Sequence, residues 1–284
     1  MTKALLAGLV ALVLAVPQAT RASEAPATRN DDARVAIASR MRGDPAAAEI
    51  ALRLYDRDAI VVDVEAAHRM NGGFRGMIQI VPALPSGSER AHIAWTDAAF
   101  ADFGAFFTSL APHETDVKYR FRPITLRFFR SVGRTTPSAY ALDWTIAYNV
   151  DGSLMTSADA VRETLFHEIF HLNDQAHGDW SACGLAPIFD AVVAKCGARS
   201  ECLAPYAPNT TKVRGGTYYA FYPGNGVGEY AAELALRYYK EHRAVFHKAV
   251  FGAAFKCGPA ENAQAWKAIT DEFFGGIDRT PACP

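Results

Sequence analysis

Two histidines and a glutamate form the pattern with the clearest chemistry in this 284-residue chain. His167, Glu168 and His171 together read H-E-x-x-H. On a helix, residues four apart lie one turn above each other on the same face, so both imidazoles can reach one metal ion. Glu168 can then take a proton from a water at the metal's open position. The pattern predicts a catalytic zinc site, and the alternative is a buried, metal-free histidine pair.

The sequence around this pattern predicts a helix from about Ser157 to about His177. Apolar residues repeat at helical spacing along it, at Val161, Leu165, Ile169 and Leu172. Thr156 or Ser157 can cap its start, and Gly178 can end it. Both histidines therefore fall in the second half of a regular helix, where their side chains would be held rigidly.

A third metal ligand is needed, because a catalytic zinc usually takes three protein ligands and keeps one position for water. Glu229 and Glu233 lie four residues apart on a second predicted helix, from Glu229 to about Lys240. Glu229 would bind the metal, and Glu233 would accept the free ring N–H of a histidine ligand. The competing candidates are His177 and, more remotely, Asp179.

In these residues the chain resembles the gluzincin peptidases, both thermolysin-like and especially lethal-factor-like, in which E-x-x-x-E follows H-E-x-x-H on a second helix. The resemblance covers roughly residues 140 to 240. It implies Glu229 as the third ligand and a tyrosine that stabilises the oxyanion of the transition state. Tyr222, seven residues before Glu229, has the matching placement, and Tyr218 and Tyr219 compete with it.

With His177 as ligand, the spacing is instead that of the metzincin peptidases. Two departures count against this alternative. Asp174 stands where metzincins have a turn-forming glycine, and no methionine follows Met155, so their methionine turn beneath the metal is missing. A non-enzymatic zincin-like binding domain is a third alternative, but such a module would need only the ligands and not Glu168.

The first 22 residues have the features of a secretory signal peptide, with one lysine, a long apolar run and small residues before the expected cleavage point. This run is too short for a comfortable membrane span, and no later stretch approaches that length. The predicted segments that follow are a mobile leader over 23–44, an N-terminal α/β lobe over 45–178 and a mostly helical C-terminal lobe over 179–284. We expect a secreted or periplasmic protein.

Five cysteines occur, all in the last part of the chain: Cys183, Cys196, Cys202, Cys257 and Cys283. In an exported protein they predict disulfides, and Cys196 with Cys202 is the first pair we expect because it closes a short loop. Lys and Arg total 29 against 30 Asp and Glu, so no strong field attracts nucleic acid or an anionic membrane. A peptide or protein substrate is the expected partner.

The resemblance implies an α+β fold of zincin type, with two lobes and a mixed sheet. Further helices are expected over residues 45–55, 96–111, 187–196 and 263–274, and strands over 60–64, 76–81 and 141–150. The aromatic stripe of the helix at 96–111 is expected to be core. The strand at 141–150 is suited to pair with an extended peptide substrate, unless both its edges are paired internally. Arginines between 120 and 134 either recognise an acidic substrate or form a solvated strand face.

Overall fold

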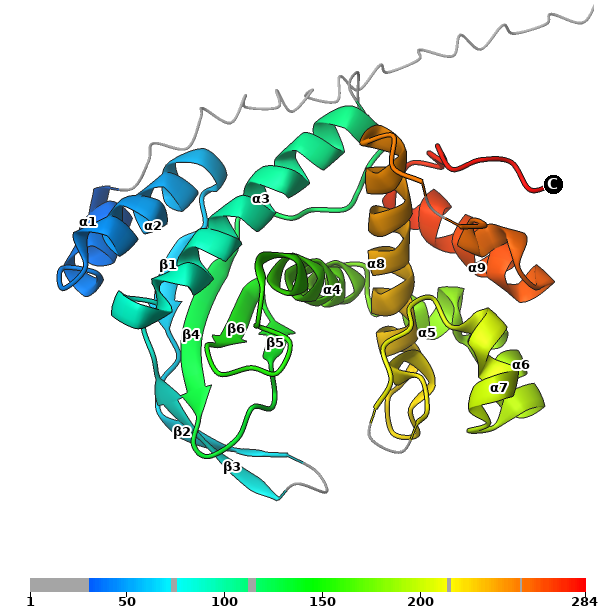
Figure 1. Cartoon of the computed structure of the whole chain (residues 1–284), viewed down its shortest axis with the longest axis horizontal. Helices are drawn as coiled ribbons and strands as arrows, with labels where there is room; N and C mark the ends of the chain where they lie inside the picture. Colours follow the sequence, from blue (N-terminus) through cyan, green and yellow to red (C-terminus); the bar gives the residue numbers. More distant parts are fainter. Residues whose placement is uncertain (1–30, 73–75, 112–115, 214–215, 251) are drawn as a thin grey trace, which may run out of the picture. The chain divides into compact units, whose positions relative to one another are not determined.

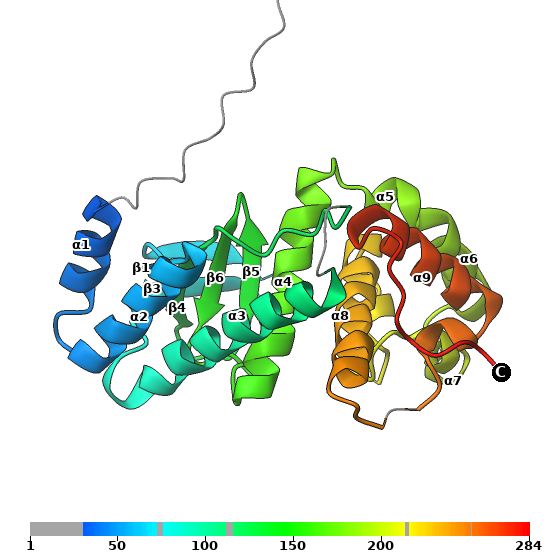
Figure 2. The same ribbon diagram turned by 90° about the horizontal axis from the view of Figure 1, so that it is seen from above.

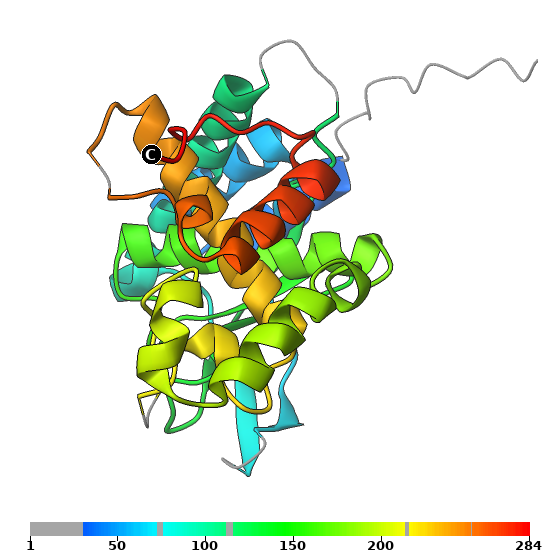
Figure 3. The same ribbon diagram turned by 90° about the vertical axis from the view of Figure 1, so that its right-hand side faces the viewer.

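The computed structural model describes residues 31–72, 76–111, 116–213, 216–250 and 252–284, so the expected signal peptide lies outside the described residues. Over residues 31–284 the fold is mixed α/β, with a curved mixed sheet and many helices (Figure 1). This agrees with the α+β class expected from the sequence. The helices that follow the H-E-x-x-H helix gather on the side away from the sheet (Figure 2), and this side faces the viewer in Figure 3.

The sheet has six strands in the order β2-β3-β4-β6-β5, and β1 also pairs with β4. The strands are β1 (Val61–Val64), β2 (His68–Asn71), β3 (Met77–Pro82), β4 (Thr125–Ser131), β5 (Ala139–Leu142) and β6 (Thr145–Asn149). β4 runs parallel to β1 and β6 and antiparallel to β3, while β5 pairs antiparallel with β6. β5 is therefore an edge strand, and it lies next to the helix that carries H-E-x-x-H.

The prediction of one strand over residues 141–150 is wrong. The segment belongs to the β5–β6 hairpin, and its turn is formed by Asp143 and Trp144, with φ of 49° and 56°. Positive φ at both turn positions is typical of the two-residue type I′ hairpin turn, which Asn-Gly or Asp-Gly normally signals. Asp-Trp carries no such signal, and the alternation of apolar and polar residues runs through the turn. As a result β6 is an internal strand, and of these two hairpin strands β5 is the one with a free edge.

The α-helices are α1 (Asp31–Arg40), α2 (Pro45–Asp58), α3 (Arg90–Leu110), α4 (Ala158–Ala176), α5 (Ser181–Gly184), α6 (Ala186–Cys196), α7 (Ser200–Leu203), α8 (Val227–Phe246) and α9 (Ala260–Phe273). Helix α3 begins six residues before the predicted start at Thr96 and follows a short 3-10 turn, Gly87–Glu89. The expected leader is helical over α1, and Ile37 of this helix and Met41 directly after it are buried. Two apolar residues in a stretch rich in Ala, Arg and Asp gave too weak a pattern to reveal this helix.

Helix α4 lies between the sheet and α8, with α3 packed along it (Figures 1 and 2). An aromatic cluster joins the three helices: the Phe166 ring of α4 stacks on Tyr239 of α8, 4.4 Å between centroids, and on Tyr119, 4.9 Å. Phe103 and Phe106 of α3 complete it and are almost fully buried, which confirms that the stripe of this helix is core. Such packing fixes α4 against α8, and the site depends on that relation.

Two disulfides staple the C-terminal region. Cys196 pairs with Cys202, as predicted, and Cys257 pairs with Cys283 near the end of the chain. Cys183 is exposed and unpaired. Over the residues that the structure describes, no helix is both long and apolar enough to cross a membrane.

Candidate metal centre

Helix α4 presents both histidines of the motif on one face. Its start is capped by Ser157, whose side chain accepts the N–H of Ala160 at 3.2 Å, so the prediction of the cap is confirmed. The opposite face is buried in the core through Val161, Leu165, Ile169 and Leu172, each at most 1 % exposed. The helix ends before Gly178, which has φ of 73°. Burial of one face therefore sets the direction in which His167 and His171 point.

The first turn of α8 brings Glu229 to these histidines. Its Oε2 lies 3.0 Å from His167 Nε2 and 3.6 Å from His171 Nε2. The two Nε2 atoms are 3.1 Å apart. Two helices, far apart in the sequence, thus place three ligand atoms around one point.

These three atoms fit a tetrahedral metal ion. Zinc–nitrogen and zinc–oxygen bonds of 2.0–2.2 Å at tetrahedral angles separate the ligand atoms by about 3.3 Å. The observed separations of 3.0 to 3.6 Å bracket that value. The side chains of His171 and Glu229 are 21 % and 26 % exposed, which leaves one side of the site open. The group of His167, His171 and Glu229 could therefore hold a metal ion.

Glu233, one turn after Glu229 on α8, contacts the other nitrogen of His167. Its Oε1 lies 3.3 Å from His167 Nδ1, and the residue is only 5 % exposed. A carboxylate in this position holds the imidazole with its Nε2 lone pair toward the metal and makes it a stronger ligand. The structure thus places Glu233 where the sequence expected it.

The charges of the site favour a cation between them. Burial alone would lower the pKa of His167, but the Glu229 and Glu233 carboxylates raise this pKa well above its usual value. Burial would raise the pKa of Glu229, but its hydrogen bonds to His167 and His171 lower this pKa strongly. Without a metal ion, a proton on His167 is therefore held between this histidine and the carboxylates, in the place that a divalent ion would take.

Glu168 follows His167 directly and is partly buried. Burial raises the pKa of this carboxyl, the two histidines lower it, and Glu229 raises it further, so that the net shift is upward. A carboxyl whose pKa is raised is a better proton acceptor when it is ionised.

Among the tyrosines before α8, Tyr219 faces the centre. Its ring centroid lies 6.0 Å from that of His167. Burial raises the pKa of Tyr219, and the nearby Glu229 and Glu168 carboxylates raise it further. The ring of Tyr218 lies under Lys212 Nζ, 4.9 Å away. For Tyr222 the described contacts with this turn are those of its backbone, which donates to Tyr219 C=O at 3.1 Å.

The loop that carries Tyr219 is held by Asn225. Its side-chain amide donates to Tyr219 C=O at 3.0 Å, and its backbone N–H donates to Tyr222 C=O at 2.9 Å. The segment Tyr219–Phe221 is a short 3-10 turn, after which the chain enters α8 through Gly226. Three tyrosines within five residues gave no sequence signal for which one this turn directs at the metal centre.

His177, the rival third ligand, points away from the centre. Its Nδ1 lies 2.7 Å from Glu272 Oε1, and its ring packs on Phe273 with 4.8 Å between centroids. Asp179 is exposed in the turn after α4, with φ of 54°. Glu229, and neither of these residues, therefore completes the group around the histidines.

Comparison of the chain with protein-family models, with curated proteins and with solved structures gives no match. The arrangement itself offers two imidazoles and a carboxylate around an open position. Beside them lie the carboxyl group of Glu168 and the phenol of Tyr219. These are the groups needed to polarise a carbonyl, move one proton and stabilise an oxyanion.

Proposed function

We propose that the protein is a zinc-dependent endopeptidase of the gluzincin kind, acting outside the cytoplasm. The observation that carries the proposal is the convergence of His167, His171 and Glu229 at near-tetrahedral separations, with Glu168 next to the first ligand. One carboxylate and two imidazoles form a common ligand set of catalytic zinc. A purely structural site would instead be closed by a fourth protein ligand.

In this proposal each residue of the chain has a distinct role. A zinc ion held by the three ligands would act as a Lewis acid and lower the pKa of a bound water toward about 7. Glu168 takes a proton from the attacking water and later donates it to the leaving amine. Glu233 keeps His167 in the tautomer that has Nε2 free. The Tyr219 hydroxyl donates a hydrogen bond to the oxygen that becomes negative in the transition state.

The free edge of β5 is the element we assign to substrate binding. β5 lies beside α4, as Figure 2 shows, and its outer edge is unpaired in the described sheet. An extended peptide can add to such an edge as a further strand, because its backbone N–H and C=O groups complete the ladder. A peptide bond would then pass along the face of α4 that carries the histidines.

The two disulfides fit a protein that works in an oxidising compartment. They support the proposed secreted or periplasmic location. The same setting agrees with the signal peptide expected from the sequence.

The test is metal analysis of the purified protein combined with digestion of casein and of a mixed peptide library, with and without a chelator. We expect about one zinc per chain and hydrolysis that stops on chelation and returns with zinc. Glu168→Gln should keep zinc and lose hydrolysis by roughly 10³-fold or more, since the proton acceptor is removed and the ligands stay. Zinc binding without any hydrolysis by the unmodified protein would instead identify a binding domain.

A further inference from the structure

Arg120 is held in a fixed position beside the metal-site helix. Asn173, two residues after His171 on α4, accepts the Arg120 N–H at 2.7 Å and donates its side-chain amide to the Arg120 C=O at 2.8 Å. Asn173 is 1 % exposed, so these bonds are protected from water. The backbone of Arg120 is therefore tied to the same helix that carries the ligands.

The side chain of Arg120 lies flat on an aromatic ring. Its guanidinium carbon is 3.3 Å from the centroid of Trp144, the second residue of the β5–β6 turn. Stacking covers one face of the guanidinium and leaves the N–H groups at its rim able to donate in the plane. The arginine is thus oriented in advance for a planar acceptor such as a carboxylate.

No acidic group neutralises Arg120 within the part of the chain that the structure describes. Neighbouring arginines of the same segment behave differently: Arg122 pairs with Asp58 at 2.7 Å, and Arg130 pairs with Asp151 at 2.5 Å. For Arg120, burial lowers the pKa and no carboxylate acts on it. A stacked, exposed guanidinium without an acid of its own has its donors available for a ligand.

The position of this arginine follows from its two partners. Trp144 comes two residues after Leu142, the last residue of the β5 edge, and Asn173 comes just after the second histidine. A peptide that extends the sheet at β5 while passing the metal ligands would run beside the β5–β6 turn. Arg120 lies at that end of its path.

We propose that Arg120, stacked on Trp144, binds a carboxylate of the peptide substrate, so that the enzyme prefers acidic substrates. This inference rests on the proposed peptidase function. Both an Asp or Glu side chain and a free C-terminal carboxylate offer the required planar, bidentate acceptor.

The test compares kcat/KM for peptide series that carry Glu or Gln at each position around the cleaved bond, each made with a free or an amidated C-terminus. We expect one position, or the free C-terminus, to raise kcat/KM about tenfold, as a hydrogen-bonded charge pair would. Arg120→Met should abolish this preference and leave cleavage of the neutral, amidated peptide unchanged. Arg120→Lys should retain part of it, because a lysine keeps the charge without the bidentate geometry.

Arg134 provides the matched control, since it is an exposed arginine in the turn after β4 with no described ion pair. Arg134→Met should keep the preference for the acid.

Cleavage of the library with no preference for a carboxylate, or a preference that survives in Arg120→Met, would overturn the inference and leave the peptidase function standing. No hydrolysis of any peptide by the unmodified protein would overturn both. A preference confined to the free C-terminus, lost in Arg120→Met, would support the site and identify the source of its ligand.

Discussion

At the scale of single residues, the contacts of Glu229 and His177 lead to opposite expectations. Glu229→Ala removes a carboxylate that lies within 3.6 Å of both histidine Nε2 atoms, so zinc affinity should fall by more than a hundredfold. His177→Ala removes a contact to Glu272 and should leave zinc affinity unchanged. Titration of each variant with zinc against a competing chelator measures this. The reverse order of effects would return the third-ligand role to His177.

In the same zinc titration, Glu233→Ala should have an effect of intermediate size. The lost group contacts His167 Nδ1 and does not face the metal, so a loss of roughly 10- to 100-fold in affinity is expected. Its effect should therefore fall between those of Glu229→Ala and His177→Ala.

The phenol of Tyr219 gives a second expectation for single residues. Tyr219→Phe should keep zinc and fold while lowering kcat by about a hundredfold with little change in KM, because the hydroxyl acts on the transition state. Tyr222→Phe, the matched change three residues later, should leave kcat near that of the unmodified protein. Steady-state kinetics on one neutral peptide decide between them. A large loss in Tyr222→Phe alone would favour the residue that the sequence ranked first.

Which side chains share a helix face could be predicted from the sequence, whereas the approach of Glu229 to the histidines was expected only from the resemblance to the gluzincins, because it joins two helices far apart in the chain. Residues four apart on a helix share a face whatever the rest of the fold does, and this holds for His167 with His171 and for Glu229 with Glu233. The choice between Tyr218, Tyr219 and Tyr222 depends on a 3-10 turn and one asparagine contact in an irregular loop. No periodic pattern reports such a turn, so the residue types could not show that Tyr219 lies near His167.

At the scale of elements, Asn225 links the loop before α8 to the proposed chemistry. Its amide donates to Tyr219 C=O, and one such hydrogen bond is worth about 1 kcal/mol. Asn225→Ala should therefore lower kcat by roughly three- to tenfold through misplacement of Tyr219, with zinc affinity unchanged. In the Tyr219→Phe background the same substitution should have no further effect on kcat. Independent, multiplying losses in the double variant would show that Asn225 acts elsewhere.

The prediction of an element succeeded where capping and helix-ending residues marked its ends, and it failed where a turn lacked the usual residues. Helix α4 was placed within a residue at each end because a serine cap and a glycine bound it. The hairpin of β5 and β6 was missed because Asp143 and Trp144 adopt positive φ without a glycine. Because of this hairpin, the free edge belongs to β5. The proposed substrate-binding strand is therefore β5, and not the single strand predicted to end at Val150.

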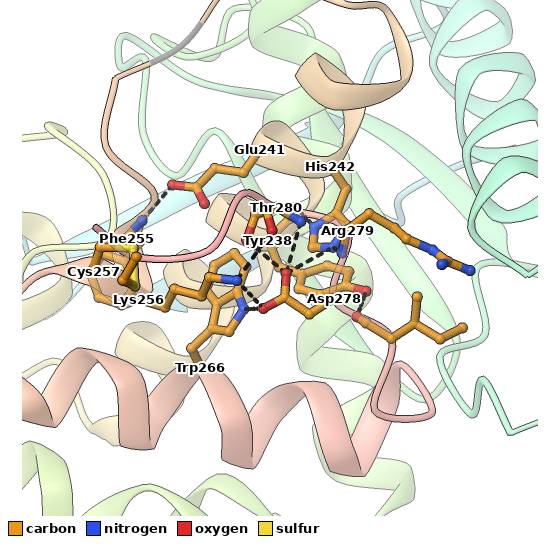
Figure 4. Close-up of polar contacts among 12 residues, drawn as sticks. Tyr238, Glu241, His242, Phe255, Lys256, Cys257, Trp266, Asp278, Arg279 and Thr280 are labelled. Carbon is orange, nitrogen blue, oxygen red and sulfur yellow. Dashed lines mark hydrogen bonds and ion pairs between the residues drawn. A yellow bond between two sulfur atoms is a disulfide. The ribbon is translucent and has the colours of Figure 1, made fainter.

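At the scale of the whole molecule, the C-terminal segment is tied back onto α8 and α9. Asp278 accepts from Lys256 Nζ at 2.7 Å and from Trp266 Nε1 at 3.0 Å, and the Cys257–Cys283 disulfide closes the same region (Figure 4). This second pairing could not be predicted, because five cysteines allow many connectivities and only a short loop such as Cys196–Cys202 stands out. The contacts of this segment form only when the last residues of the chain return to the helices, so they depend on the complete fold.

Within this region, His242 of α8 makes the stability of the fold depend on pH. The imidazole is 0 % exposed, its Nδ1 lies 2.9 Å from Tyr238 C=O, and its Nε2 accepts the Arg279 N–H at 3.0 Å (Figure 4). Burial lowers its pKa from 6.5 to about 4; the hydrogen bond to Tyr238 C=O and the charge of Asp278 oppose the shift, while Lys256 and Arg279 favour it. A proton on Nε2 would break the bond to Arg279.

Because the pKa of His242 is lower in the folded than in the unfolded chain, the unfolded state binds the proton more tightly. Its contribution to stability is therefore complete above about pH 6.5 and is lost as the pH falls toward 4. A shift of this size corresponds to about 3 kcal/mol in the free energy of unfolding. Urea unfolding between pH 7.5 and 4 should show this loss in the unmodified protein.

Other groups also titrate between pH 6.5 and 4. The contribution of His242 is therefore obtained by comparing the free energy of unfolding of a His242 variant with that of the unmodified protein at each pH. His242→Gln keeps a donor and an acceptor but cannot take up the proton, so its free energy of unfolding should fall less steeply between pH 6.5 and 4. His247→Gln, at an exposed histidine five residues later, should follow the unmodified protein throughout. Equal slopes for all three proteins would mean that His242 is not the group whose protonation loosens the C-terminal segment.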